Sequence, residues 1–62
     1  MPIVQIHFME GRSVAKKRTL IEKVTAAICE SIDVPPEKVR IILSEMKPEH
    51  YASGGKLRLD QE

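Results

Sequence analysis

One long helical stretch lies between two strand-like segments, and this order restricts the chain to few folds. Residues 3–9 alternate between apolar and polar side chains and are rich in β-branched residues, which predicts a β-strand. From residue 13 to about residue 32, apolar residues recur at the steps of one helical face, and Ser13 is placed to cap the first turn. Residues 33–36 end the helix because they include two prolines.

Residues 39–46 form the second predicted strand, and their nearly continuous apolar character favours burial on both faces. Because a helix separates the two strands, they are expected to pair in parallel as a right-handed βαβ unit. In the tail, residues 50–57 contain the pair Gly54-Gly55, which predicts a short hairpin. The sequence therefore predicts a single α/β domain over residues 1–62.

The chain is so short that this fold would be only marginally stable as a single copy. A protein of 62 residues buries only about 60% of the surface that its unfolded form exposes, and a two-stranded sheet is barely stable in water. The lone Cys29 has no partner for an internal disulfide, and no Cys/His spacing matches a structural zinc site. We therefore expect copies of the chain to associate.

Charge and hydropathy argue against two classes of partner. Ten Lys and Arg residues against nine Asp and Glu leave a formal charge of +1, which disfavours nucleic-acid binding. No apolar run approaches the ~20 residues of a membrane span, and the amino terminus lacks the basic leader of an export signal. A lone thiol suits a reducing compartment, so we expect a soluble, cytoplasmic protein without a membrane partner.

Pro2 is the first candidate catalytic residue. Removal of Met1 would leave Pro2 with a free secondary amine fixed at the start of a strand. Ordinary α-amino groups titrate near 7.7–8.0, and nearby positive charge or loss of water lowers that pKa toward neutrality, where a general base works best. The alternative is a proline that merely begins a strand.

Arg12 and Arg40 are the candidate anion-binding residues. Arg12 follows the first strand, and Arg40 interrupts an otherwise apolar second strand. A guanidinium fork matches a carboxylate in bidentate fashion, so two forks would hold a dicarboxylate. The alternatives are a solvated turn residue at position 12, and at position 40 a salt bridge to Glu45 or to a neighbouring subunit.

The other polar residues receive no catalytic role. The basic run at residues 16–18 is typical of a solvated helix face, although it could also steer an anionic substrate. Ser13 is expected to be a cap and Cys29 a small buried hydrophobe. His7 and His50 do not have the spacing of metal ligands, so no metal site is predicted.

With these residues in place, the chain resembles the 4-oxalocrotonate tautomerases, also called 2-hydroxymuconate tautomerases, of the tautomerase superfamily. The resemblance covers nearly the whole chain, and its pieces are specific in combination. They are Pro2-Ile3, Glu10-Gly11-Arg12-Ser13, Leu20-Ile21 through Val24, Val39-Arg40-Ile41-Ile42 leading to Glu45-Met46, and His50-Tyr51 before Gly54-Gly55.

The resemblance implies a homohexamer, a trimer of dimers, with active sites built across subunit boundaries. Pro2 matches the family's general base, and Arg40 matches the arginine that holds the carboxylate and carbonyl end of the substrate. Arg12 matches the arginine that holds the distal carboxylate. Tyr51 stands where the family usually has a Phe wall, and Met9 takes the place of another aliphatic wall residue. The family requires no metal or cofactor.

The activity implied is isomerisation of an unsaturated dicarboxylate, 2-hydroxymuconate to 2-oxo-3-hexenedioate, in the breakdown of aromatic compounds. Two related activities are the alternatives within the superfamily, phenylenolpyruvate tautomerisation and dehalogenation of a haloacrylate by water addition. From a different class, a non-catalytic oligomeric module could use the same arginines to bind an anionic partner.

Overall fold

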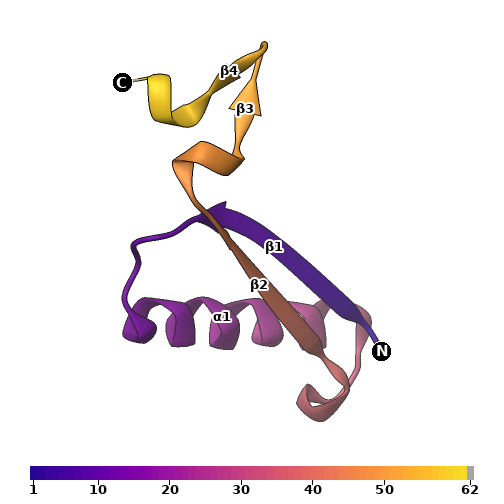
Figure 1. The fold of residues 1–62 in the computed structure, drawn as a ribbon. Helices are drawn as coiled ribbons and strands as arrows, with labels where there is room; N and C mark the ends of the chain where they lie inside the picture. The colour runs from indigo at the N-terminus through magenta and orange to yellow at the C-terminus, as the bar shows by residue number, and fades with distance from the viewer. Residues whose placement is uncertain (62) are drawn as a thin grey trace.

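A computed structural model describes residues 1–61 of the chain and confirms the predicted strand–helix–strand order. Strand β1 spans Ile3–Met9, helix α1 spans Val14–Ile32 and strand β2 spans Arg40–Met46. The strands pair in parallel, and α1 lies across one face of their sheet (Figure 1). Short 3₁₀ turns, η1 (Pro36–Lys38) and η2 (Pro48–His50), precede and follow β2.

Both ends of α1 are set by local hydrogen bonds. At the amino end, Ser13 Oγ accepts a hydrogen bond of 3.2 Å from the backbone amide of Lys16, which confirms the predicted cap. At the carboxyl end, Asp33 adopts a left-handed conformation with φ 57°, and its amide donates to the carbonyl oxygen of Cys29. The residues that flank this 19-residue helix therefore cap both of its ends.

The tail forms the predicted hairpin. Strands β3 (Ala52–Ser53) and β4 (Lys56–Leu57) pair in antiparallel fashion. Gly54 and Gly55 connect them with φ 61° and 80°, the positive values that a two-residue hairpin turn of this kind requires. The hairpin and the final 3₁₀ turn, η3 (Arg58–Asp60), extend beyond the carboxyl end of β2, away from α1 (Figure 1).

The sheet has one covered face and one open face, which corrects the expectation that β2 is buried on both sides. The register pairs Val4 with Ile41 and Ile6 with Leu43, and these half-buried residues face α1. On the other face, Ile42 is 52% exposed, because residues 1–61 provide a single α-helix to cover the two-stranded sheet.

The isolated chain is too open for a stable monomer. None of residues 1–61 is fully buried, and the chain exposes 5009 Å², whereas a folded monomer of this mass exposes about 4,000 Å². Its radius of gyration is 14.7 Å, against about 11 Å for a compact domain of this length. Among the residues described, no helix is both long enough and apolar enough to cross a bilayer. The structure thus supports the argument from length that copies associate.

Candidate active site

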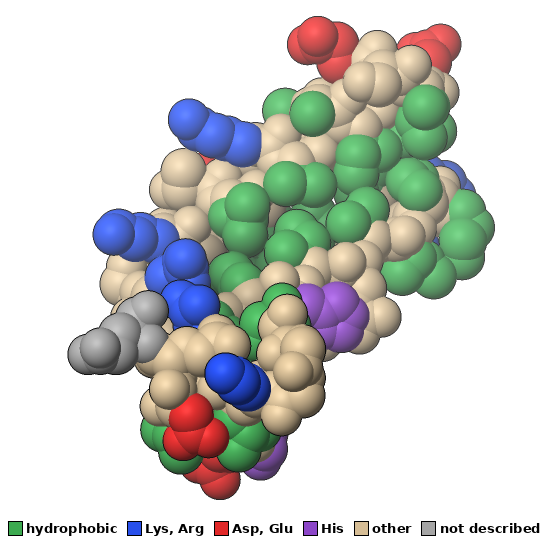
Figure 2. All heavy atoms as spheres, turned by 90° about the horizontal axis from the view of Figure 1, so that it is seen from above, with side chains coloured by type: hydrophobic (Ala, Val, Ile, Leu, Met, Phe, Trp, Pro, Cys, Tyr) green, Lys and Arg blue, Asp and Glu red, His purple; other side chains and the backbone are tan. Residues whose placement is uncertain are grey.

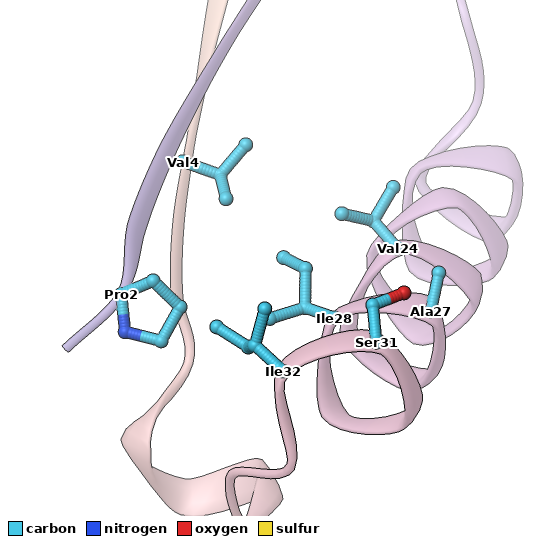
Figure 3. A pocket seen from close by; sticks show the side chains of 7 residues that line it. All are labelled: Pro2, Val4, Val24, Ala27, Ile28, Ser31 and Ile32. Carbon is cyan, nitrogen blue, oxygen red and sulfur yellow. The ribbon is translucent and has the colours of Figure 1, made fainter.

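Pro2 lines an apolar pocket at the amino end of β1. The pocket has a volume of about 340 Å³ and is formed by two residues at the start of the chain and five from the last turns of α1, namely Pro2, Val4, Val24, Ala27, Ile28, Ser31 and Ile32. Figure 3 shows the Pro2 ring and Val4 across from the isoleucine side chains of α1. Ser31 supplies the only side-chain oxygen among these lining residues, so the surface beside Pro2 is apolar, although it is open to solvent in the single chain.

A second pocket, of about 330 Å³, lies at the other end of the same groove between β1 and α1. Its lining combines apolar residues with three basic ones, namely Ile6, Phe8, Leu20, Arg12, Lys16 and Lys17. Figure 2 shows the hydrophobic side chains as a continuous band, bordered on one side by Lys and Arg side chains. The groove therefore changes from apolar at the Pro2 end to cationic at the Arg12 end.

Arg12 is exposed, but two contacts hold its side chain at this second pocket. Its Nη1 donates a hydrogen bond of 3.0 Å to the carbonyl oxygen of Met9, and its Cζ lies 5.4 Å from the centre of the Phe8 ring. These two contacts restrain the guanidinium and leave its other N–H donors for an anion. This geometry argues against the alternative of a freely solvated turn residue.

Arg40 begins β2 beside Pro2, but its side chain belongs to the other face of the sheet. The register pairs Arg40 with Ile3, on the open face, whereas the Pro2 pocket lies on the helix side. The proposed alternative of an Arg40–Glu45 salt bridge is wrong. Glu45 faces α1 and pairs with Lys17 at 2.7 Å.

One chain does not bring the candidate residues together. Pro2 and Arg12 lie beyond opposite ends of β1, and the strand rise of 3.3 Å per residue separates Pro2 from Met9 by about 23 Å. Met9 is the last residue of β1, and Tyr51 follows the carboxyl end of the parallel strand β2, so both belong to the Arg12 end. Arg40 belongs to the Pro2 end. A site that contains all of them needs more than one copy of the chain.

Tyr51 is 46% exposed and lines neither pocket of its own chain. Its carbonyl oxygen accepts a hydrogen bond of 2.7 Å from the amide of Arg58, which ties the start of the hairpin to η3. The hydroxyl makes no hydrogen bond within residues 1–61. The ring is therefore presented to a neighbouring molecule or to solvent.

Pro2 has an amide nitrogen as long as Met1 precedes it, and an amide is not a base. Met1 is 70% exposed, so the peptide bond before Pro2 is at the surface of the chain. General-base chemistry at this position requires that Met1 be removed.

The remaining candidates do not converge on a second site. Cys29 is half-buried on α1, and His50 lies on η2, 4.0 Å from Glu49, with both side chains largely exposed. His7 is on the open sheet face. Among residues 1–61, no three His, Cys, Asp or Glu side chains gather as metal ligands would.

The sequence did not point to Ala27 or Ser31 as site residues, and it indicated only a solvated face or a steering charge for Lys16 and Lys17. Ala27 and Ser31 line the Pro2 pocket, while Lys16 and Lys17 line the Arg12 pocket. The spacing of four between Ala27 and Ser31 was the available signal, because residues four apart share a helix face. This spacing does not show which end of a strand the helix face contacts.

Comparisons with known proteins agree with this geometry. A sequence profile of the family described as "Tautomerase enzyme" matches residues 2–60. The 2-hydroxymuconate tautomerase of Pseudomonas putida is 51% identical over 57 residues, which cover 92% of this chain and 90% of that protein. The crystal structure of YwhB, a homologue of 4-oxalocrotonate tautomerase, is 41% identical with a TM-score of 0.94 and covers 98% of this chain and 100% of its own. A heterohexameric 4-oxalocrotonate tautomerase from Chloroflexus aurantiacus is 34% identical with a TM-score of 0.91, and each chain is covered completely.

Proposed function

This chain belongs to the tautomerase family and is an isomerase, and on that premise we propose that it converts 2-hydroxymuconate or a similar dienol dicarboxylate to the conjugated ketone. The single observation that carries the proposal is the groove between β1 and α1, apolar beside Pro2 and cationic at Arg12. Because these two ends lie about 23 Å apart in one chain, a six-carbon dicarboxylate would bind where the Pro2 end of one copy meets the Arg12 end of another. Its unsaturated chain would then lie against the apolar end and its distal carboxylate against the cationic end.

Pro2 is the proposed general base. Once Met1 is removed, its amine takes the proton from the enol hydroxyl and returns it to the dienol carbon farthest from that hydroxyl. The electron pair of the O–H bond becomes the carbonyl π bond, and the π pair of the nearer C=C moves to the bond between the two former double bonds. The π pair of the farther C=C forms the new C–H bond. The apolar lining around Pro2 and the cationic arginines both lower the pKa of such an amine, which keeps it unprotonated near neutral pH.

The two arginines have separate proposed roles. Arg40 binds the carboxylate and carbonyl end and stabilises negative charge that develops on the carbonyl oxygen during proton transfer. Arg12 anchors the distal carboxylate, for which the contacts with Met9 and Phe8 restrain its guanidinium. Met9 and Tyr51 contribute the wall of the site at the same end.

Association of several copies of the chain would bring Pro2, Arg12 and Arg40 together. If two copies lie antiparallel about a two-fold axis, the Pro2 end of one groove meets the Arg12 end of the other, and two equivalent sites form. Arg40 would come from a further copy, since its side chain leaves the sheet on the face away from the Pro2 pocket. A homohexamer made of three such dimers satisfies both requirements.

We place the enzyme in the cytoplasm, in the breakdown of aromatic compounds that yield dienol dicarboxylates. The lone Cys29 suits a reducing compartment. The name of the 2-hydroxymuconate tautomerase from Pseudomonas putida supports the substrate class.

The decisive test follows the ketonisation of 2-hydroxymuconate and of phenylenolpyruvate by ultraviolet absorbance. The protein used must have an intact mass that shows that Met1 is absent. We expect fast ketonisation of the dicarboxylate and slower turnover of the monocarboxylate. Turnover of phenylenolpyruvate alone would reject the proposed substrate class, and chloride release from 3-chloroacrylate alone would replace the reaction by hydrolytic dehalogenation. Absence of turnover with every substrate would favour the anion-binding module.

A further inference from the structure

Three adjacent basic residues of α1 have three different environments. Lys17 Nζ is 2.7 Å from Glu45 Oε1, so its charge is neutralised by β2. Arg18 is exposed and lines neither pocket. Lys16 lines the pocket beneath Arg12, and its side chain forms no ion pair within residues 1–61. The structure thus pairs Lys17 with β2 and leaves Lys16, which is exposed, at the edge of the pocket without an ion-pair partner among residues 1–61.

The Arg12 pocket has an excess of positive charge. Glu45 is engaged by Lys17, and among residues 1–61 no acidic side chain lines the pocket. The first turn of α1 also contains no acidic residue, so the partial positive charge of the helix terminus adds to that of the side chains. Within the described residues 1–61, Arg12 and Lys16 are therefore two cations without an anionic partner, and they share the pocket lining with Ile6, Phe8 and Leu20.

We propose that Lys16 and Arg12 together bind the distal carboxylate of the substrate, and that Lys16 makes the enzyme prefer dianionic over monoanionic ligands. This inference rests on the proposed function and adds to it a specificity-determining residue. Arg12 supplies the planar fork that orients a carboxylate, and Lys16 supplies a flexible point charge in the lining of the same pocket. A ligand with a methyl group in place of the distal carboxylate gains nothing from Lys16.

The test uses a matched pair of inhibitors, trans,trans-muconate and sorbate, which differ only in the replacement of one carboxylate by a methyl group. Their inhibition constants are measured for the wild type, Lys16→Gln, Lys16→Arg and Arg18→Gln. Arg18→Gln removes the same charge two positions away, outside the pocket, and controls for the overall field. We expect Lys16→Gln to raise the inhibition constant of muconate about tenfold, which corresponds to the loss of one charge-assisted hydrogen bond.

The control variants and the sorbate measurements should show little change in the inhibition constant. The inhibition constant of sorbate should rise less than about twofold in every variant. In Arg18→Gln, the inhibition constant of muconate should stay within about twofold of the wild-type value. Lys16→Arg should retain tight muconate binding. The kcat on 2-hydroxymuconate should stay near the wild-type value in Lys16→Gln while KM rises, because the lost contact lies away from the reacting atoms.

Each contrary result has a distinct meaning. Equal weakening of muconate and sorbate in Lys16→Gln, or equal effects of Lys16→Gln and Arg18→Gln on muconate, would overturn the role of Lys16 while the proposed function stands. A wild type that turns over no enol and binds neither inhibitor would overturn the proposed function, and this inference with it.

Discussion

The backbone amide of Arg40 donates a hydrogen bond of 3.0 Å to the carbonyl oxygen of Pro2. This bond continues the parallel ladder of β1 and β2 by one residue and fixes both candidate residues at one end of the sheet. Their side chains nevertheless diverge, because Pro2 lines the pocket on the helix side and Arg40 pairs with Ile3 on the open face. The backbone that joins the two residues also prevents them from serving the same site within one chain.

Replacement of Pro2 tests the base. Pro2→Ala retains an amino-terminal amine after Met1 removal but loses the secondary amine and its rigid ring. We expect kcat/KM on 2-hydroxymuconate to fall by about 10² or more, the usual contribution of a positioned base. Intact mass must show that Met1 is absent from both proteins, and wild-type activity in Pro2→Ala would refute the assignment.

Mixing of two impaired variants tests whether the site is shared between copies. Arg12→Ala should raise KM with little change in kcat, because it removes an anchor. When Pro2→Ala and Arg12→Ala subunits are mixed in equal amounts and reassembled, about one quarter of the sites should combine an intact Pro2 with an intact Arg12 from the other copy. The measurement is kcat/KM before and after mixing, and absence of recovery would place both residues in one chain.

Arg40 should affect the chemical step more than binding. Arg40→Ala removes a donor from the developing oxyanion, so kcat should fall by about 10²–10³. Arg40→Lys keeps the charge without the bidentate fork and should give an intermediate value. If Arg40→Ala changed KM alone, the residue would be an anchor like Arg12.

Dissociation should remove structure and activity together. Residues 1–61 include no fully buried side chain, so an isolated copy lacks the core that would hold α1 against the sheet. We expect the helical circular dichroism and the tautomerase activity to fall over the same range of dilution, measured beside sedimentation velocity. A folded, fully active monomer would contradict both the fold argument and the shared site.

Ser13 should contribute stability without a direct catalytic part. Ser13→Ala leaves the amide of Lys16 without its side-chain acceptor and should lower the free energy of unfolding by about 0.5–2 kcal/mol. Denaturant unfolding at one fixed protein concentration measures this, with Ser13→Asn as the control that restores a capping acceptor. An unchanged midpoint in Ser13→Ala would show that the cap adds nothing to the assembled protein.

Local patterns were enough to predict most of the elements. The alternation in residues 3–9, the Ser13 cap and the Gly54-Gly55 turn each depend on neighbours a few residues apart, and the structure confirms all three. The parallel pairing was also predictable, because a helix between two strands leaves little choice of direction. The same reasoning failed for β2, since its apolar residues do not reveal that only one face meets α1.

The sequence by itself determined the elements, their order and the residue types that chemistry would need, through interactions within one or two turns of chain. Only the tertiary structure decided which groups meet. Register placed Arg40 on the face away from the Pro2 pocket, and the packing of α1 on the sheet brought Lys17 to Glu45. These relationships join residues far apart in the chain, and local propensity carries no information about them because a shift of one residue in register moves a side chain to the opposite face.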